Sequence, residues 1–104
     1  MPKRAKKYED SLVEALKDPV EAAAYLNAYL EDTDEPDEQG FLLALKDVAK
    51  AYGMSNIAES SNLGRESLYK SLSADGNPKL TTLVALLSSM GLHLSVNPKD
   101  KESA

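Results

Sequence analysis

Hydrophobic residues recur at helical spacing along most of the chain. The clearest pattern lies in residues 41–52, where apolar side chains stand at positions i, i+3, i+4, i+7 and i+11: Phe41, Ala44, Leu45, Val48 and Tyr52. This spacing places all five on one face and predicts a helix that buries that face. Gly53 follows directly and is suited to end the helix.

Two helices are expected before this one. Residues 9–16 carry three apolar residues at helical spacing, with acidic residues in the first turn. Asp18 and Pro19 are typical of an N-cap followed by proline at the first helical position. The alanine-rich segment after them runs to Glu31 and has one apolar stripe, formed by Ala22, Tyr25, Leu26, Tyr29 and Leu30.

The C-terminal part has one more segment with helical spacing, followed by a segment with alternating apolar and polar residues. Residues 80–90 place five apolar side chains on one face, and Gly91 is suited to stop that helix; the five are Leu80, Leu83, Val84, Leu87 and Met90. Residues 92–96 alternate apolar and polar side chains, which predicts a short strand. The predicted class is therefore all-α, with five or six helices and a short C-terminal strand.

Between these segments, residues 55–62 and 65–72 predict two short helices joined by a tight turn, the helix-turn-helix pattern. The first helix has Ser55 as N-cap, with Ile57 and the small residue Ala58 facing inward. Four positions after Ala58, Asn62 suits the left-handed conformation that such a turn needs. The remaining positions are a corner plug, a cap for the second helix and two inward residues: Leu63, Gly64, Leu68 and Leu72.

The outward positions of the second helix are the candidate DNA contacts. The N-terminal residues of such a helix reach base edges in the major groove. Arg65 is suited to pair with guanine, and Glu66 and Ser67 to hydrogen-bond base edges. Tyr69 and Lys70 suit phosphates. Asn62, at the turn, completes the set of candidate contacts. The alternative interpretation is that these side chains are simply solvated, and that the Glu66 carboxylate only stabilises the helix N-terminus through the helix dipole.

Charge is distributed unevenly along the chain. The net charge is −5, and residues 8–40 contain eleven acidic residues against the single Lys17. Residues 1–7 contain four basic residues and form a flexible N-terminus in this interpretation, while residues 41–97 are suited to meet a polyanion. The predicted organisation is completed by a helical segment with an acidic linker over 8–40, and by a flexible tail over 98–104.

Composition argues against several classes of protein. The chain has no Cys and one histidine, His93, so we expect no metal site and no cofactor. The five glycines form neither a phosphate loop nor a dinucleotide fingerprint, and an enzyme is not expected. No apolar run approaches the 18 residues of a membrane span, and no apolar stretch follows the basic start. We therefore expect a soluble cytoplasmic protein with no membrane association.

Residues 41–91 resemble the phage-repressor (lambda-repressor-like, Cro-like) helix-turn-helix domain. From about Tyr8 to Val96, the chain resembles addiction-module antidote proteins of bacterial toxin–antitoxin operons, most specifically in AESSNLGRESLYKSLS and GNPKLTTLVALLSSMGL. One departure is Asn62, where phage repressors usually have glycine. The resemblance implies an antitoxin that binds its own double-stranded DNA operator, represses the operon and neutralises a RelE/ParE-like toxin.

Partners follow from these interpretations, and alternatives remain. A single recognition helix makes few base contacts, so we expect a homodimer on two half-sites about one DNA turn apart. One alternative is a prophage-type repressor without a toxin. Another is a protein–protein module in which residues 8–40 bind a basic partner and the helix-turn-helix is only scaffold. The strand over 92–96 would pair with its twin, with an N-terminal segment or with a toxin strand.

Overall fold

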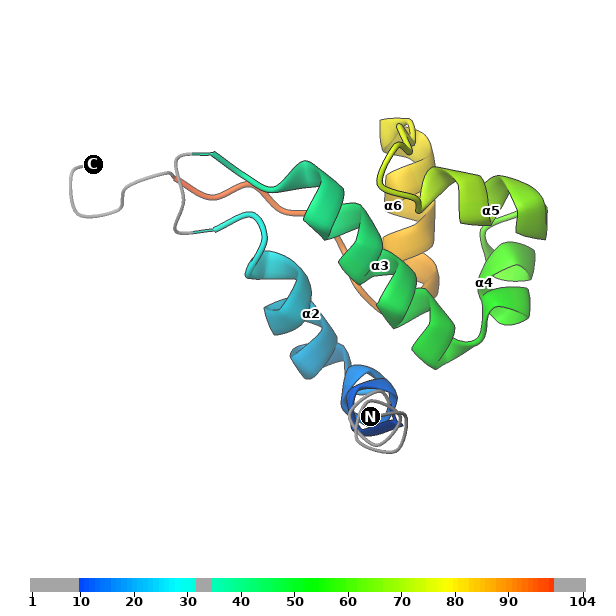
Figure 1. The fold of residues 1–104 in the computed structure, drawn as a ribbon, viewed down its shortest axis with the longest axis horizontal. Coiled ribbons are helices and arrows are strands. Elements are labelled where there is room, and N and C mark those ends of the chain that lie inside the picture. The colour runs from blue at the N-terminus through cyan, green and yellow to red at the C-terminus, as the bar shows by residue number, and fades with distance from the viewer. Residues whose placement is uncertain (1–9, 32–34, 99–104) are drawn as a thin grey trace, which may run out of the picture.

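The computed structural model describes residues 10–31 and 35–98, and every regular element in these two ranges is a helix. The predicted all-α class is confirmed for them. The interpretations made for residues 1–7, for the acids at 32–34 and for the tail from residue 99 lie outside the described residues. Figure 1 shows the helices in chain order: residues 10–16, α2 (Pro19–Asn27), α3 (Glu38–Tyr52), α4 (Met54–Ser60), α5 (Arg65–Ser71) and α6 (Leu80–Ser89).

α3 lies at the centre of the fold. α2 packs along one side of it, α4 packs against it from the other side, and α5 and α6 both contact α4 (Figure 1). The buried residues of α3 cover about half of its circumference, and they are Phe41, Leu42, Ala44, Leu45, Val48, Ala49 and Ala51. Because the buried arc is this wide, α3 meets α2 and α4 at the same time.

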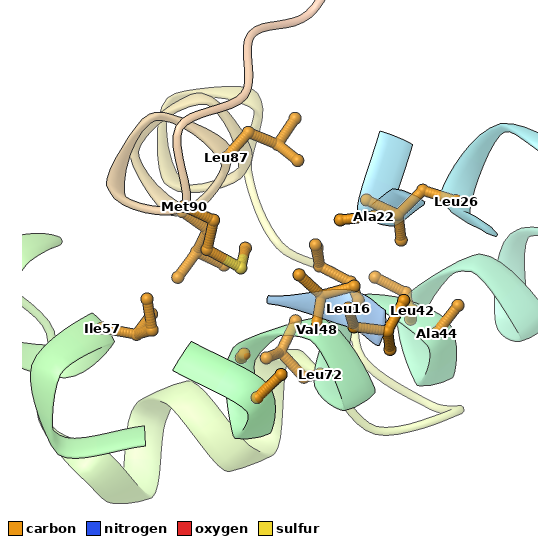
Figure 2. Packing of buried hydrophobic residues seen from close by; sticks show 14 of the residues in the cluster. Leu16, Ala22, Leu26, Leu42, Ala44, Val48, Ile57, Leu72, Leu87 and Met90 are labelled. Carbon is orange, nitrogen blue, oxygen red and sulfur yellow. The ribbon is translucent and has the colours of Figure 1, made fainter. Parts of the chain in front are cut away.

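One hydrophobic core joins the helices. Figure 2 shows side chains from α2, α3, α4 and the end of α6 converging on a single cluster. Its largest fully buried side chains come from segments throughout the described chain: Leu16, Leu45, Val48, Ile57, Leu68, Leu72, Leu86 and Met90. No polar or charged residue of the described chain is buried, so the core depends on apolar burial, worth roughly 25 cal/mol per Å².

α2 begins at Pro19 as predicted and ends earlier than predicted. The Asp18 carboxylate accepts a hydrogen bond from the Val20 N–H at 2.9 Å, as an N-cap does. The helix stops at Asn27, and Tyr29 and Leu30 lie in the turn after it. Their N–H groups bond to carbonyls three residues back, which tightens the chain and turns it toward α3.

Tyr25 links α2 to α3. Its hydroxyl donates a hydrogen bond of 2.7 Å to the Asp47 carboxylate, and its ring meets the edge of the Tyr29 ring at a centroid distance of 6.0 Å. Burial, reinforced by the hydrogen bond to Asp47, raises the pKa of the Tyr25 phenol well above its ordinary value of 10.0. The phenol therefore stays protonated and keeps donating to Asp47 at neutral pH.

α3 begins at Glu38, before the predicted start at Phe41. The Asp37 side chain caps it by accepting a hydrogen bond from the Gly40 N–H at 2.9 Å. A Cβ at Gly40 would collide with the Asp37 carboxylate and lie 2.7 Å from Cδ1 of Tyr29. Gly40 is therefore a close-approach position inside the first turn of α3.

α4 also begins one residue before its predicted boundary. Ser55 was the expected N-cap, but Gly53 occupies that position with φ of +99° and makes no side-chain cap. Gly53 also ends α3, as predicted, through a bond from its N–H to the Lys50 carbonyl. Met54, the first residue of α4, is buried, and this burial brings the start of the helix forward.

The turn between α4 and α5 has the predicted geometry. Asn62 adopts the left-handed conformation with φ of +62°. The Leu63 N–H donates to the Ala58 carbonyl at 2.9 Å and the Asn62 N–H to the Glu59 carbonyl at 3.2 Å, which is a Schellman motif. Leu63 then packs against the core, and Gly64 is the N-cap of α5, both as predicted.

The predicted apolar face of α6 is wrong at two positions. Leu83 and Leu87 contribute to the core, but Leu80 is 68% exposed and Val84 is 45% exposed. Leu86, which the predicted stripe left out, is fully buried. The large apolar residues of α6 span an arc wider than the part that the core covers, and the rest of the helix carries only Ala, Ser and Thr. The sequence therefore does not determine which part of this arc is buried; packing on α4 does.

The predicted C-terminal strand is also wrong. Gly91 ends α6 as expected, with φ of +77°, and the Leu92 N–H donates to the Leu87 carbonyl at 2.8 Å. Residues 92–98 have no regular secondary structure. A strand needs a neighbouring strand to receive its backbone hydrogen bonds, and no other strand exists over 10–31 and 35–98.

We expect Tyr25→Phe to lower the free energy of unfolding by about 1 kcal/mol at pH 7, because the bond to Asp47 is lost while the ring stays. The raised pKa sets the pH dependence. The bond contributes fully below the unfolded-state pKa of about 10 and is lost as the pH rises through the higher folded-state pKa. In urea denaturation, the difference in unfolding free energy between the variant and the wild type should therefore be smaller at pH 11 than at pH 7. Equal stability of variant and wild type at pH 7 contradicts this.

Asn62→Ala should destabilise the protein by about 1–2 kcal/mol, since alanine pays the left-handed backbone cost that asparagine tolerates. Asn62→Gly is the matched control and should be at least as stable as the wild type. Thermal or urea unfolding without DNA measures both variants. A glycine variant as unstable as the alanine variant would mean that the side chain, not the backbone, stabilises the turn.

Candidate nucleic-acid interface

The candidate interface is the face of α5 that points away from the core. Leu68 and Leu72 have no exposed surface, so the opposite side of this short helix lies in solvent. All five predicted outward residues are exposed: Arg65, Glu66, Ser67, Tyr69 and Lys70. These five side chains, which the sequence analysis assigned to DNA contact, are therefore all accessible to solvent around α5.

Asn62 lies beside this surface and not within it. Its side chain is exposed, and its backbone forms the turn that leads into α5. The turn geometry accounts for asparagine at this position without any contact to DNA. Asn62 is therefore an exposed residue of the turn whose structural role is already explained.

Lys46 belongs to the candidate interface although the sequence analysis did not select it. It lies on α3, and its Nζ is 5.8 Å from the centroid of the Tyr69 ring on α5. This cation–π contact orients the ammonium group beside the exposed face of α5 and leaves its N–H groups able to bind an anion. No local pattern links residues so far apart in the chain, so only the packing of α5 beside α3 could reveal it.

Tyr69 contacts Lys46 of α3, a contact that the sequence analysis did not predict. The residue is 38% exposed, and its ring lies beneath the Lys46 ammonium group. The side chain thereby connects the cation from α3 to the surface that carries Lys70. The two lysines and Arg65 supply hydrogen-bond donors of the kind that phosphates and guanine edges accept.

Acidic side chains concentrate on a different part of the molecule. Residues 10–31 and α2 lie on the side of α3 away from α4 and α5 (Figure 1). Their exposed acids include Asp10, Glu14, Asp18, Glu21 and Glu31. Glu14 pairs with Lys17 at 2.9 Å, and both side chains are largely exposed, so this ion pair contributes little to stability. The negative net charge is therefore not centred on α5.

No three His, Asp or Glu side chains meet as metal ligands in the described parts of the chain. His93 is exposed on the segment after α6. Over the same described ranges, no helix has the length and apolar character needed to cross a bilayer.

Known proteins are similar to this chain over most of its length. A family model described as "Probable addiction module antidote protein" matches residues 6–98. A protein from Haemophilus influenzae, named "Uncharacterized protein", is 36% identical over 85 residues, which is 82% of this chain and 84% of that protein. No solved structure matches significantly. The match to the family model spans all the described helices, and the chain belongs to the family of probable addiction module antidote proteins.

Proposed function

We propose that the chain is an antitoxin that binds the operator of its own toxin–antitoxin operon through α5 and represses transcription. The observation that carries the DNA-binding part is the α4–turn–α5 unit, with Leu68 and Leu72 inside and a polar face outside. This arrangement is typical of DNA-binding helix-turn-helix domains. The protein acts by binding alone, in the cytoplasm, with no catalytic step.

The residues of the interface take distinct roles in this proposal. Arg65, in the first turn of α5, pairs with a guanine in the major groove, and Glu66 and Ser67 hydrogen-bond neighbouring base edges. Lys70 and the pair formed by Lys46 and Tyr69 bind phosphates, which positions α5 without reading sequence. Asn62, at the turn before α5, contacts the sugar–phosphate backbone of the DNA.

The antidote family implies a toxin partner. We propose a RelE/ParE-like toxin, bound through the acidic side of the molecule. The exposed carboxylates on residues 10–31 support this surface, since opposite charges favour encounter with a basic protein. The same acidic side supports the second candidate, a protein–protein module whose α5 is only scaffold. A repressor without a toxin is less consistent with the family match.

The experiment that tests the proposal is binding to a labelled DNA fragment from upstream of the gene, with unrelated DNA as control, at two salt concentrations. We expect retention that is selective and falls with salt. Arg65→Ala should weaken binding to the specific site by about 1–3 kcal/mol and relax one base preference. An equal loss on all sequences would make Arg65 a phosphate contact. No selectivity by the folded protein would overturn the repressor function.

The phosphate role of Lys46 predicts a change in salt dependence. Lys46→Met should weaken binding to every DNA sequence and lower the salt slope by about one, as should Lys70→Ala. Lys17→Met is the matched control, because it removes the same charge beside α2, on the other side of α3. If the control changes the slope as much as Lys46→Met does, the effect comes from net charge and not from a contact.

A further inference from the structure

The side of α2 that faces away from the core is mostly apolar. Glu21 is the one charged residue among the nine of this helix. Val20 is 74% exposed, and Ala24 and Ala28, which follow it at intervals of about one turn, are exposed as well. A surface helix normally carries polar residues on its outer side, so an apolar outer side indicates that another molecule covers it. We call Val20, Ala24 and Ala28 the α2 face.

Buried side chains and hydrogen bonds hold α2 in place on α3. The opposite side of the helix enters the core through Ala22 and Leu26. Tyr25 bonds to α3 as described above, and the Tyr52 hydroxyl of α3 donates to the Lys17 carbonyl, just before α2, at 3.4 Å. A helix that is ordered in advance loses little conformational freedom when a partner binds, which favours its use in recognition.

Acidic side chains lie at both ends of the α2 face and restrict what can cover it. Glu14 and Asp18 precede the face and Glu31 and Asp37 follow it, all exposed, while the nearby base Lys17 pairs with Glu14. Two α2 faces packed together would place carboxylates opposite carboxylates in either direction, and nucleic acid phosphates would be repelled in the same way. The partner that fits is a protein with an apolar groove and basic side chains near the ends of that groove.

We propose that the α2 face anchors the chain to its toxin, which receives this helix in an apolar groove bordered by Arg or Lys side chains. The step rests on the proposed function, in which the toxin binds the acidic side of the molecule. Exposed ion pairs steer the encounter but contribute little affinity, whereas a buried aliphatic side chain contributes more. Val20 fills the groove, and the small side chains of Ala24 and Ala28 let the toxin come close to the helix. α5 lies across α3 from this contact (Figure 1).

The test is binding of the full-length chain to the purified toxin encoded in the same operon, measured by surface plasmon resonance. Ala24→Lys should weaken binding by about 100-fold or more, because it places a cation inside an apolar groove with a basic border. Val20→Ala should weaken it by about tenfold, since it removes apolar contact and no charge. Ser60→Lys, at an exposed site on α4, is the matched control and should bind as the wild type does. Circular dichroism verifies that each variant folds.

Two results would overturn the inference. One is a toxin that does not bind the wild type, or that binds folded Ala24→Lys as tightly as Ser60→Lys. The other is unchanged affinity of Val20→Ala, which would leave the acidic side chains alone as the toxin contact. If the wild type still binds its operator selectively, either result removes only the α2 face and keeps the repressor function. Toxin binding that Ala24→Lys weakens, without selective DNA binding by the wild type, supports the α2 face and overturns the repressor function instead.

Discussion

The fold depends on burying α3 on two sides at once. Leu45 and Val48 have no exposed surface, and the buried arc around them is too wide for one neighbouring helix to cover. α2 covers one side and α4 the other. The consecutive residues Lys46 and Asp47 show the result. Asp47 accepts the hydrogen bond from Tyr25 on α2, whereas Lys46 lies over Tyr69 on α5.

This division explains how a protein with a net charge of −5 can carry Lys46, Arg65 and Lys70 apart from most of its acids, as the proposed DNA binding needs. The exposed carboxylates of residues 10–31 lie across α3 from α5. Charges separated by more than about 8–10 Å of solvent are largely screened at physiological salt. The acidic side therefore need not oppose an anion at α5. A member of an antidote family that also regulates DNA, as we propose, requires two such separate surfaces.

The orientation of α5 depends on a small set of residues at the turn. Asn62 reverses the chain in the left-handed conformation, and Leu63 returns it to the core after bonding to the Ala58 carbonyl. Leu68 is then carried inward and the polar face outward. No residue of α5 itself determines this orientation alone, since a seven-residue helix has little stability without tertiary packing.

The sequence by itself determined the local features of this protein. It predicted the cap at Asp18, the turn at Asn62, the stop at Gly91 and the inward and outward faces of α5, because each depends on residues close together in the chain. Only the tertiary structure decided which side of α6 is exposed, and that residues 92–96 form no strand. An apolar pattern shows that a segment prefers burial, but packing partners decide which face is buried and whether a strand has a neighbour. For the same reason only the fold could place Lys46 beside α5 and leave Leu80 and Val84 uncovered.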